Sequence, residues 1–216
     1  MAALEYQERP AAGRPQGLLV LHHGRGADQH DLLPLADVFD PERRLHVVTP
    51  QAPLRLPGAP GYHWYVVPRV GYPEPETFEG SRALLSEFHD ELWARTGLTP
   101  GQTVLGGFSQ GTVMSYAMAL SADRPAPAGV LALSGFIPTV PGWEPQFSDR
   151  KSMRVLISHG RLDPVIPVQF GQQARAELEA AGLPVDYREF EGGHNVDPRD
   201  LPRSVAWLQS ALASAP

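Results

Sequence analysis

The sequence contains no cysteine. This absence excludes disulfide bridges, thiolate zinc sites, iron–sulfur clusters and a cysteine nucleophile. The chain also has no run of Lys or Arg, and its formal net charge at pH 7 is −6. A surface that follows a phosphate backbone needs clustered positive charge, so we expect no nucleic-acid partner. Covalent chemistry, if there is any, must use a residue other than cysteine.

Long apolar segments are missing as well. No stretch approaches the roughly 20 apolar residues that a membrane-spanning helix requires, so we expect no membrane span. Residues 1–17 carry scattered charges and two prolines where a secretory signal has an unbroken apolar stretch. We therefore expect a protein that acts in the cytoplasm.

The chain has 216 residues, of which 42% are hydrophobic. This is enough for one substantial core, so we expect a single domain over residues 1–216. Short apolar runs predict strands at 17–22, 45–49, 103–108, 129–134, 154–159 and 185–190. Segments of helical period predict helices at 78–92, 170–181 and 201–212. This alternation predicts an α/β fold with a mostly parallel central sheet and helices on both faces.

Residues 50–75 differ from the rest of the chain because they hold seven prolines together with a cluster of aromatic side chains. Irregular loops of this length in compact domains are usually functional or disordered. The aromatic content argues that this segment packs on something. We expect an irregular loop close to the active site.

The pentapeptide Gly-Phe-Ser-Gln-Gly at 107–111 fits the G-x-S-x-G pattern of a nucleophile elbow. The pattern alone is weak, but here it follows a predicted strand and precedes a helix. A serine on such a turn is held in an unfavourable backbone conformation, with glycines where side chains would collide. We therefore expect Ser109 to be the nucleophile and the backbone N–H of Gln110 to face the developing oxyanion. The alternative is a glycine-rich turn with an incidental serine.

A serine nucleophile needs a general base, usually an imidazole, and a carboxylate that orients it. Only His159 and His194 follow Ser109 in the chain. His159 ends a predicted strand and should point into the sheet, whereas His194 follows two glycines in a loop after the last strand. We expect His194 to be the base; the alternative is a solvated loop histidine.

The orienting carboxylate is expected to lie between the serine and the histidine, which is the chain order of this type of triad. Asp163 fits, because it comes just after the penultimate strand. Three rival aspartates lie in a loop, inside a strand and at a helix N-cap, respectively: Asp149, Asp186 and Asp197.

A second oxyanion donor is expected on the glycine-rich loop after an early strand, which here is His-His-Gly-Arg-Gly-Ala-Asp at 22–28. The paired histidines raise the alternative of a metal site. Adjacent residues at a strand end point in opposite directions, and no third ligand is evident, so a structural role is favoured.

Four motifs together resemble the phospholipase/carboxylesterase family: LHHGRGAD, GFSQGT, HGRLDPVIP and GGH. The resemblance runs from about residue 17 to residue 212 and extends to small bacterial carboxylesterases and acyl-protein thioesterases. It implies the α/β-hydrolase fold, the triad of Ser109, Asp163 and His194, and oxyanion donors at Arg25 and Gln110. Where thioesterases usually show HGLGD this chain has HGRGAD, and Thr112 stands where glycine is common, so it looks closer to the bacterial carboxylesterase branch.

The expected activity is hydrolysis of short to medium acyl carboxylic esters through an acyl-enzyme, with no metal or organic cofactor. Few residues separate the strand ending at 134 from Met153, so we expect no large cap domain and an open site. Four aromatic residues in irregular segments are expected to contact the substrate, with core or lid packing as the alternative: Trp64, Tyr65, Phe136 and Trp143. Alternative activities are those of an acyl thioesterase, a lysophospholipase or a non-catalytic ligand-binding protein. A homodimer is left open.

Overall fold

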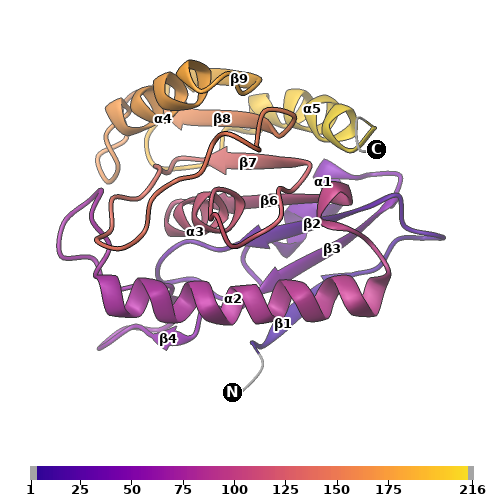
Figure 1. The fold of residues 1–216 in the computed structure, drawn as a ribbon, viewed down its shortest axis with the longest axis horizontal. Helices are drawn as coiled ribbons and strands as arrows, with labels where there is room; N and C mark the ends of the chain where they lie inside the picture. Colours follow the sequence, from indigo (N-terminus) through magenta and orange to yellow (C-terminus); the bar gives the residue numbers. More distant parts are fainter. Residues whose placement is uncertain (1–3, 214–216) are drawn as a thin grey trace.

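The computed structural model describes residues 4–213, in which seven strands form the main sheet in the order β1-β3-β2-β6-β7-β8-β9. Figure 1 shows these strands stacked from β1 to β9. All neighbours are parallel except β1, which runs antiparallel to β3. The strands are β1 Tyr6–Arg9, β2 Gly17–His22, β3 Leu45–Pro50, β6 Thr103–Phe108, β7 Gly129–Leu133, β8 Arg154–Gly160 and β9 Val185–Phe190.

Helices cover both faces of this sheet. The longer ones are α2 Pro75–Thr96, α3 Gln110–Ala119, α4 Gln169–Ala180 and α5 Leu201–Ala213, and the shorter ones are α1 Ala36–Phe39, η1 Leu33–Leu35, η2 Pro100–Gln102 and η3 Pro198–Asp200. Side chains of α2, α3 and α4 share one buried cluster, and those of α1 and α5 share another on the opposite face. The expected α/β-hydrolase architecture without a large cap is confirmed.

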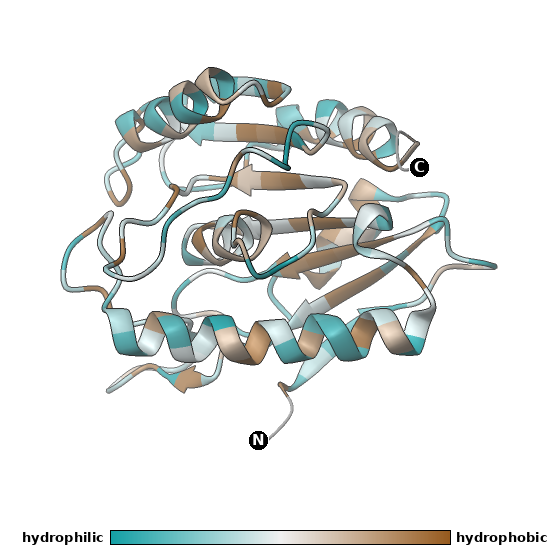
Figure 2. Ribbon diagram, in the orientation of Figure 1, coloured by the Kyte–Doolittle hydropathy of each residue, from teal (hydrophilic) through white to brown (hydrophobic). Residues whose placement is uncertain are grey.

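The central strands are apolar along their whole length because both of their faces are covered. Every residue of β2 and of β7 is buried, and Figure 2 shows these strands as hydrophobic stretches. The surface helix α2 alternates hydrophobic and hydrophilic residues in the same view. This difference explains why short apolar runs predicted the strands and helical period predicted α2.

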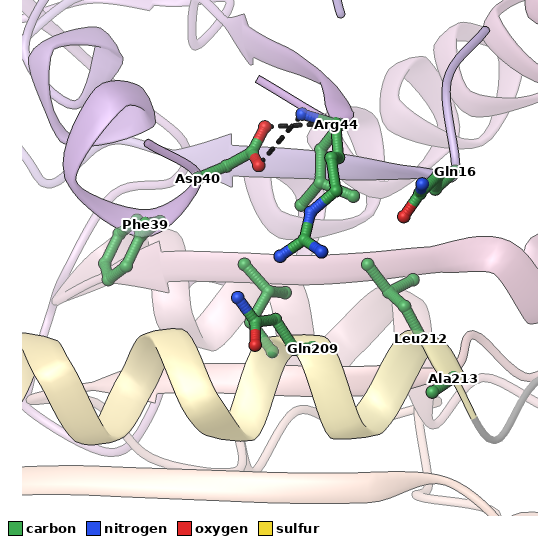
Figure 3. Close-up of a pocket in the computed structure, with 9 residues that line it drawn as sticks. Gln16, Phe39, Asp40, Arg44, Gln209, Leu212 and Ala213 are labelled. Atoms are coloured by element: carbon green, nitrogen blue, oxygen red, sulfur yellow. Dashed lines mark hydrogen bonds between the residues drawn. The ribbon is translucent and has the colours of Figure 1, made fainter. Parts of the chain in front are cut away.

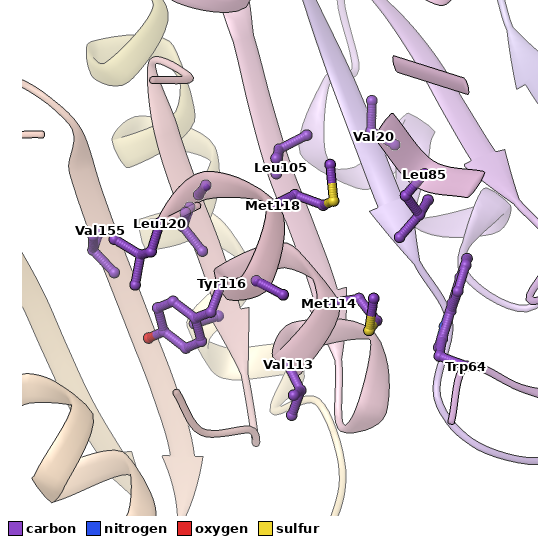
Figure 4. Close-up of a cluster of buried hydrophobic side chains, with 14 of the residues drawn as sticks. Val20, Trp64, Leu85, Leu105, Val113, Met114, Tyr116, Met118, Leu120 and Val155 are labelled. Atoms are coloured by element: carbon purple, nitrogen blue, oxygen red, sulfur yellow. The ribbon is translucent and has the colours of Figure 1, made fainter. Parts of the chain in front are cut away.

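Helix α3 is buried on all sides. Figure 4 shows its side chains Val113, Met114, Tyr116 and Met118 projecting toward the surrounding strands and helices. These side chains belong to the larger buried cluster, which also contains Leu105 of β6. The N-terminus of α3 is therefore held firmly, which matters because Ser109 directly precedes it.

Two features depart from the sequence expectations. Strand β1 has the sequence YQER, which carries no apolar alternation and so gave no strand signal. The segment 50–75 is not wholly irregular, since it contains β4 Leu54–Arg55 paired with β5 Tyr62–His63. Strands of two residues are too short for periodicity to reveal. Within residues 4–213, no helix has the length and apolarity that a membrane crossing requires.

Candidate active site

Ser109 lies between the end of β6 and the start of α3, with φ 56° and ψ −119°. A positive φ is unfavourable for a residue with a side chain and persists only where the surroundings enforce it. A Cβ atom on Gly107 would lie 2.3 Å from the backbone carbon of Gly111, and one on Gly111 would lie 1.9 Å from the backbone oxygen of His22. The two glycines of the G-x-S-x-G pattern are thus a steric requirement of this turn.

His194 meets Ser109 from the loop that follows β9. Its Nε2 atom lies 2.8 Å from the Ser109 Oγ atom, and its ring packs against Phe108 with centroids 4.8 Å apart. The backbone N–H of Leu162 donates to the carbonyl of Gly192 at 2.9 Å, which ties this loop to the one after β8. The tight glycine loop expected before His194 thus brings its imidazole over Ser109.

Asp163 completes a chain of hydrogen bonds to Ser109. Its Oδ2 atom accepts from His194 Nδ1 at 2.6 Å, while Oδ1 accepts from the backbone N–H groups of Val165 and Ile166, each at 2.8 Å. The Asp163 side chain is fully buried. With Nδ1–H donating to the carboxylate, the lone pair of His194 Nε2 faces the serine hydroxyl. The structure brings the three residues predicted as a triad into direct contact.

His159 lies next to Asp163 but does not reach Ser109. Its ring is buried, and its Nε2–H donates to the carbonyl of Ile166 at 2.8 Å. The same Nε2 atom lies 3.6 Å from Asp163 Oδ2. Burial lowers the pKa of His159, which favours the neutral imidazole. His159 therefore supports the turn that carries Asp163, a role for which the sequence offered no signal beyond its position at a strand end.

The other aspartates weighed as the acid are engaged elsewhere. Asp149 pairs with Arg150, and Asp186 pairs with Arg203. The Asp197 side chain accepts from the backbone N–H of Arg199 and caps η3, as expected. Among the described residues, Asp163 is the carboxylate that contacts His194.

The loop at 22–28 passes directly beside Ser109. A Cβ atom on Gly24 would lie 3.5 Å from the Cβ atom of Ser109. Within residues 4–213, the backbone N–H groups of Arg25 and Gln110 donate to no protein acceptor. Two free N–H groups flanking the serine are what an oxyanion hole requires.

This loop is held by bonds to the segment 50–75. The indole N–H of Trp64 donates to the carbonyl of His23 at 2.9 Å, and Gly26 N–H donates to the carbonyl of Tyr62 at 2.8 Å. His23 Nδ1–H donates to the carbonyl of Gly24 at 2.7 Å, and its Nε2 accepts from Ala52 N–H at 3.0 Å. Burial lowers the pKa of His23, so it is a neutral ring that supports the loop.

The Gln110 side chain has a part that the sequence did not suggest. Its Oε1 atom accepts from the backbone N–H of Trp64 at 2.8 Å, and its Nε2–H donates to the carbonyl of Tyr65 at 2.7 Å. The residue that offers its N–H to the site thus also anchors the segment 50–75 over it.

A cavity of about 340 Å³ opens over Ser109. It is lined by Arg25, Tyr65, Val67, Val70, Ser109, Gln110, Phe136, Val165 and Ile166. Tyr65 and Phe136 therefore lie where substrate contacts were expected. Trp64 and Trp143 do not line this cavity: Trp64 is fully buried against His23, and the Trp143 indole N–H donates to Ser121. The expected substrate contact is therefore wrong for these two tryptophans. They pack in the core, which was the alternative.

A second cavity of about 260 Å³ lies between the start of β3 and α5, at the opposite edge of the sheet. Figure 3 shows Arg44 extending toward α5, and Asp40 accepting hydrogen bonds from the backbone. Its lining residues include no serine, threonine or histidine. Of these two cavities, the one at Ser109 therefore holds the groups that hydrolysis needs.

The chain is similar to known proteins over most of its length. A family model described as Phospholipase/Carboxylesterase matches residues 9–211. In an alignment of 226 positions, the chain is 25% identical to acyl-protein thioesterase 1 of Gibberella zeae, and the alignment covers 94% of each chain. The crystal structure of esterase PE8 is 29% identical, with a TM-score of 0.82 over 97% of this chain and 100% of that chain. The carboxylesterase of Bacillus cereus shares the fold with a TM-score of 0.84 over 97% of this chain and 95% of that chain, at 21% identity. Because the family model spans most of its length, the chain belongs to the phospholipase/carboxylesterase family of serine hydrolases.

Proposed function

We propose that the protein is a serine carboxylesterase that hydrolyses short to medium acyl esters through an acyl-enzyme on Ser109. The observation that carries this proposal is the continuous chain of hydrogen bonds from Asp163 through His194 to Ser109, at the floor of a cavity. The cytoplasm stays the predicted place of action.

In the proposed first step, Ser109 Oγ attacks the ester carbonyl carbon while His194 Nε2 takes the hydroxyl proton. The negative charge that forms on the carbonyl oxygen is stabilised by the backbone N–H groups of Arg25 and Gln110. Buried Asp163 stabilises the imidazolium through Nδ1–H. Collapse of the intermediate breaks the ester C–O bond, and the leaving alcohol takes the proton from His194.

The acyl-enzyme is then hydrolysed by the same groups. Water attacks the acyl carbon as His194 Nε2 removes one of its protons, and the same N–H groups stabilise the second oxyanion. Breaking the bond to Ser109 Oγ releases the carboxylic acid and returns the proton to the serine. No atom is left over, so the cycle needs only ester and water.

The size and lining of the cavity support short to medium acyl groups. Its volume of about 340 Å³ lies near the lower end of the range of roughly 300–1,000 Å³ typical of small-molecule pockets. Its apolar wall of Val70, Phe136 and Ile166 suits a hydrocarbon chain. We expect kcat/KM to peak below a decanoyl chain and to fall toward palmitoyl.

A second candidate activity is that of an acyl thioesterase, favoured by the match to a protein named acyl-protein thioesterase 1. It would use the same triad with a thiolate leaving group. The kcat/KM ratio for matched butyryl oxyester and butyryl thioester substrates separates the two activities.

The deciding experiment is labelling with a fluorophosphonate, with the adduct mapped by mass spectrometry, alongside hydrolysis of 4-nitrophenyl esters from acetate to palmitate. We expect the adduct on Ser109, and we expect Ser109→Ala to lower kcat at least about 10³-fold because a nucleophile cannot be replaced by its neighbours. Near-normal ester cleavage by this variant, or an adduct elsewhere, would exclude the proposed mechanism. Absence of any label on the folded wild-type protein would favour a non-catalytic ligand-binding protein.

A further inference from the structure

Arg25 is the one charged residue among those that line the cavity over Ser109. The other lining residues are aliphatic, aromatic or neutral polar, and burial raises the pKa of Tyr65 so that its hydroxyl stays neutral. A cationic residue in the lining of this largely apolar cavity is out of place for a site that takes only hydrocarbon chains. It is the arrangement expected where the ligand carries a negative charge.

The guanidinium group of Arg25 is also unpaired. Among the arginines in the described part of the chain, all except Arg14 and Arg25 have an ion pair, a side-chain hydrogen bond or an aromatic ring as partner. Asp28 and Asp31 stand on the same loop, yet neither lies within ion-pair distance of it. Its five N–H donors are therefore available to a molecule from outside.

The backbone that carries Arg25 is fixed in place. On one side, the indole N–H of Trp64 donates to the carbonyl of His23; on the other, Gly26 N–H donates to the carbonyl of Tyr62. Gly61 packs so closely that a Cβ atom there would lie 2.1 Å from the carbonyl oxygen of Gly26. The side chain thus starts from a rigid point next to the nucleophile, which lowers the cost of holding a ligand there.

We propose that Arg25 makes this enzyme selective for esters that carry a second, free carboxylate. The inference rests on the proposed esterase function, because the ester must react at Ser109 while its carboxylate binds the guanidinium. Arginine suits this task because its planar fork donates two parallel hydrogen bonds to a carboxylate. The carboxylate can belong to the acyl part, as in a monoester of a dicarboxylic acid, or to the alcohol part.

Two pairs of substrates test the proposal, and within each pair the anionic and the neutral ester have the same number of acyl carbons. The acyl side is tested with mono-4-nitrophenyl adipate against 4-nitrophenyl hexanoate, and the alcohol side with 4-(butyryloxy)benzoate against phenyl butyrate. The quantity measured is the ratio of kcat/KM for the anionic ester to that for the neutral ester. Any disturbance of the loop backbone alters both esters by a common factor, which cancels in the ratio.

The informative variants are Arg25→Met and Arg25→Lys, with Arg14→Met as matched control. Arg14 is exposed and precedes β2, at the opposite end of that strand from Arg25. We expect Arg25→Met to lower the ratio roughly 10- to 100-fold for at least one pair, as the loss of a charge-assisted pair predicts. Arg25→Lys should lower it less, and Arg14→Met should leave it as in the wild type. The pair that responds identifies the part of the ester that bears the carboxylate.

An unchanged ratio in Arg25→Met for both pairs, with neutral esters still hydrolysed, would overturn the role of Arg25 and leave the esterase function standing. An equal loss in Arg14→Met would also overturn it, since net charge alone would then explain the effect. If the wild type hydrolysed none of the four esters, both this inference and the proposed function would fall.

Discussion

Asp163→Asn is the sharpest single-residue test of the proposed triad. In the native site Oδ1 accepts from two backbone N–H groups, those of Val165 and Ile166, while Oδ2 accepts from His194. An asparagine has only one oxygen acceptor. Turning its amide nitrogen toward the two backbone N–H groups would leave both buried donors unsatisfied, at a cost of about 1–3 kcal/mol each. The oxygen therefore stays with the backbone, and the amide nitrogen faces His194.

That orientation reverses the tautomer of His194. Its Nδ1 atom must accept from the amide, so the ring proton moves to Nε2, which then points a donor at Ser109. An imidazole in this form cannot take the serine proton. We expect kcat to fall about 10⁴-fold, the loss known for the equivalent change in other serine enzymes, which corresponds to roughly 5 kcal/mol.

The assay is steady-state hydrolysis of 4-nitrophenyl butyrate, with the melting temperature measured to show that the variant is folded. Asp186→Asn is the matched control, because it makes the same chemical change on β9, where Asp186 pairs with Arg203 away from the triad. We expect the control to keep wild-type kcat within about twofold. A folded Asp163→Asn enzyme with more than a tenth of wild-type kcat would refute the assignment of the carboxylate.

Two further predictions concern the fold around the site. Gly111→Ala puts a Cβ atom 1.9 Å from the backbone oxygen of His22, so we expect loss of folded protein or a melting temperature at least about 10 °C lower; Gly13→Ala, which meets no atom within 4 Å, is the control. A wild-type melting temperature for Gly111→Ala would contradict this. Burial lowers the pKa of His89 to about 3. Between pH 6.5 and pH 3 the imidazole is therefore protonated in the unfolded chain but neutral in the folded protein. The folded state loses stability as the pH falls through this range. Between pH 7.5 and pH 5.0, the free energy of unfolding measured with urea should fall by roughly 2 kcal/mol less in His89→Leu than in the wild type. An equal fall in both proteins would contradict the prediction. His30→Leu, at an exposed histidine, serves as control.

The position of Ser109, the proposed nucleophile, could be predicted because the pattern that marks it is local. A Cβ atom on Gly107 would meet the backbone of Gly111, and a Cβ atom on Gly111 would meet the backbone oxygen of His22. Both required glycines lie within five consecutive residues, so the sequence shows them together. The loop glycines before His194 and the position of Asp163 after β8 likewise follow from chain order. The expected triad could therefore be predicted from the strands and their order along the chain.

Substrate contacts could not be predicted in this way. Trp64 and Tyr65 are adjacent and both aromatic, yet Tyr65 lines the cavity and Trp64 packs in the core. Nothing in the sequence indicated the role of the Gln110 side chain, although its two hydrogen bonds anchor the segment that covers the site. Such roles depend on which distant segment contacts each side chain, and the residue type does not predict that contact.

By itself the sequence determined the α/β alternation, the position of Ser109 and the order in which Asp163 and His194 follow it, because hydrophobic period and the G-x-S-x-G pattern each extend over a few residues. Tertiary structure alone decided which groups meet. The contact of His194 with Ser109 spans 85 positions of the chain, and the contact with Asp163 spans 31. Parallel pairing of β2, β6, β7, β8 and β9 brings their carboxyl ends to one edge of the sheet, and that shared edge places Arg25 and Ser109 in the lining of one cavity.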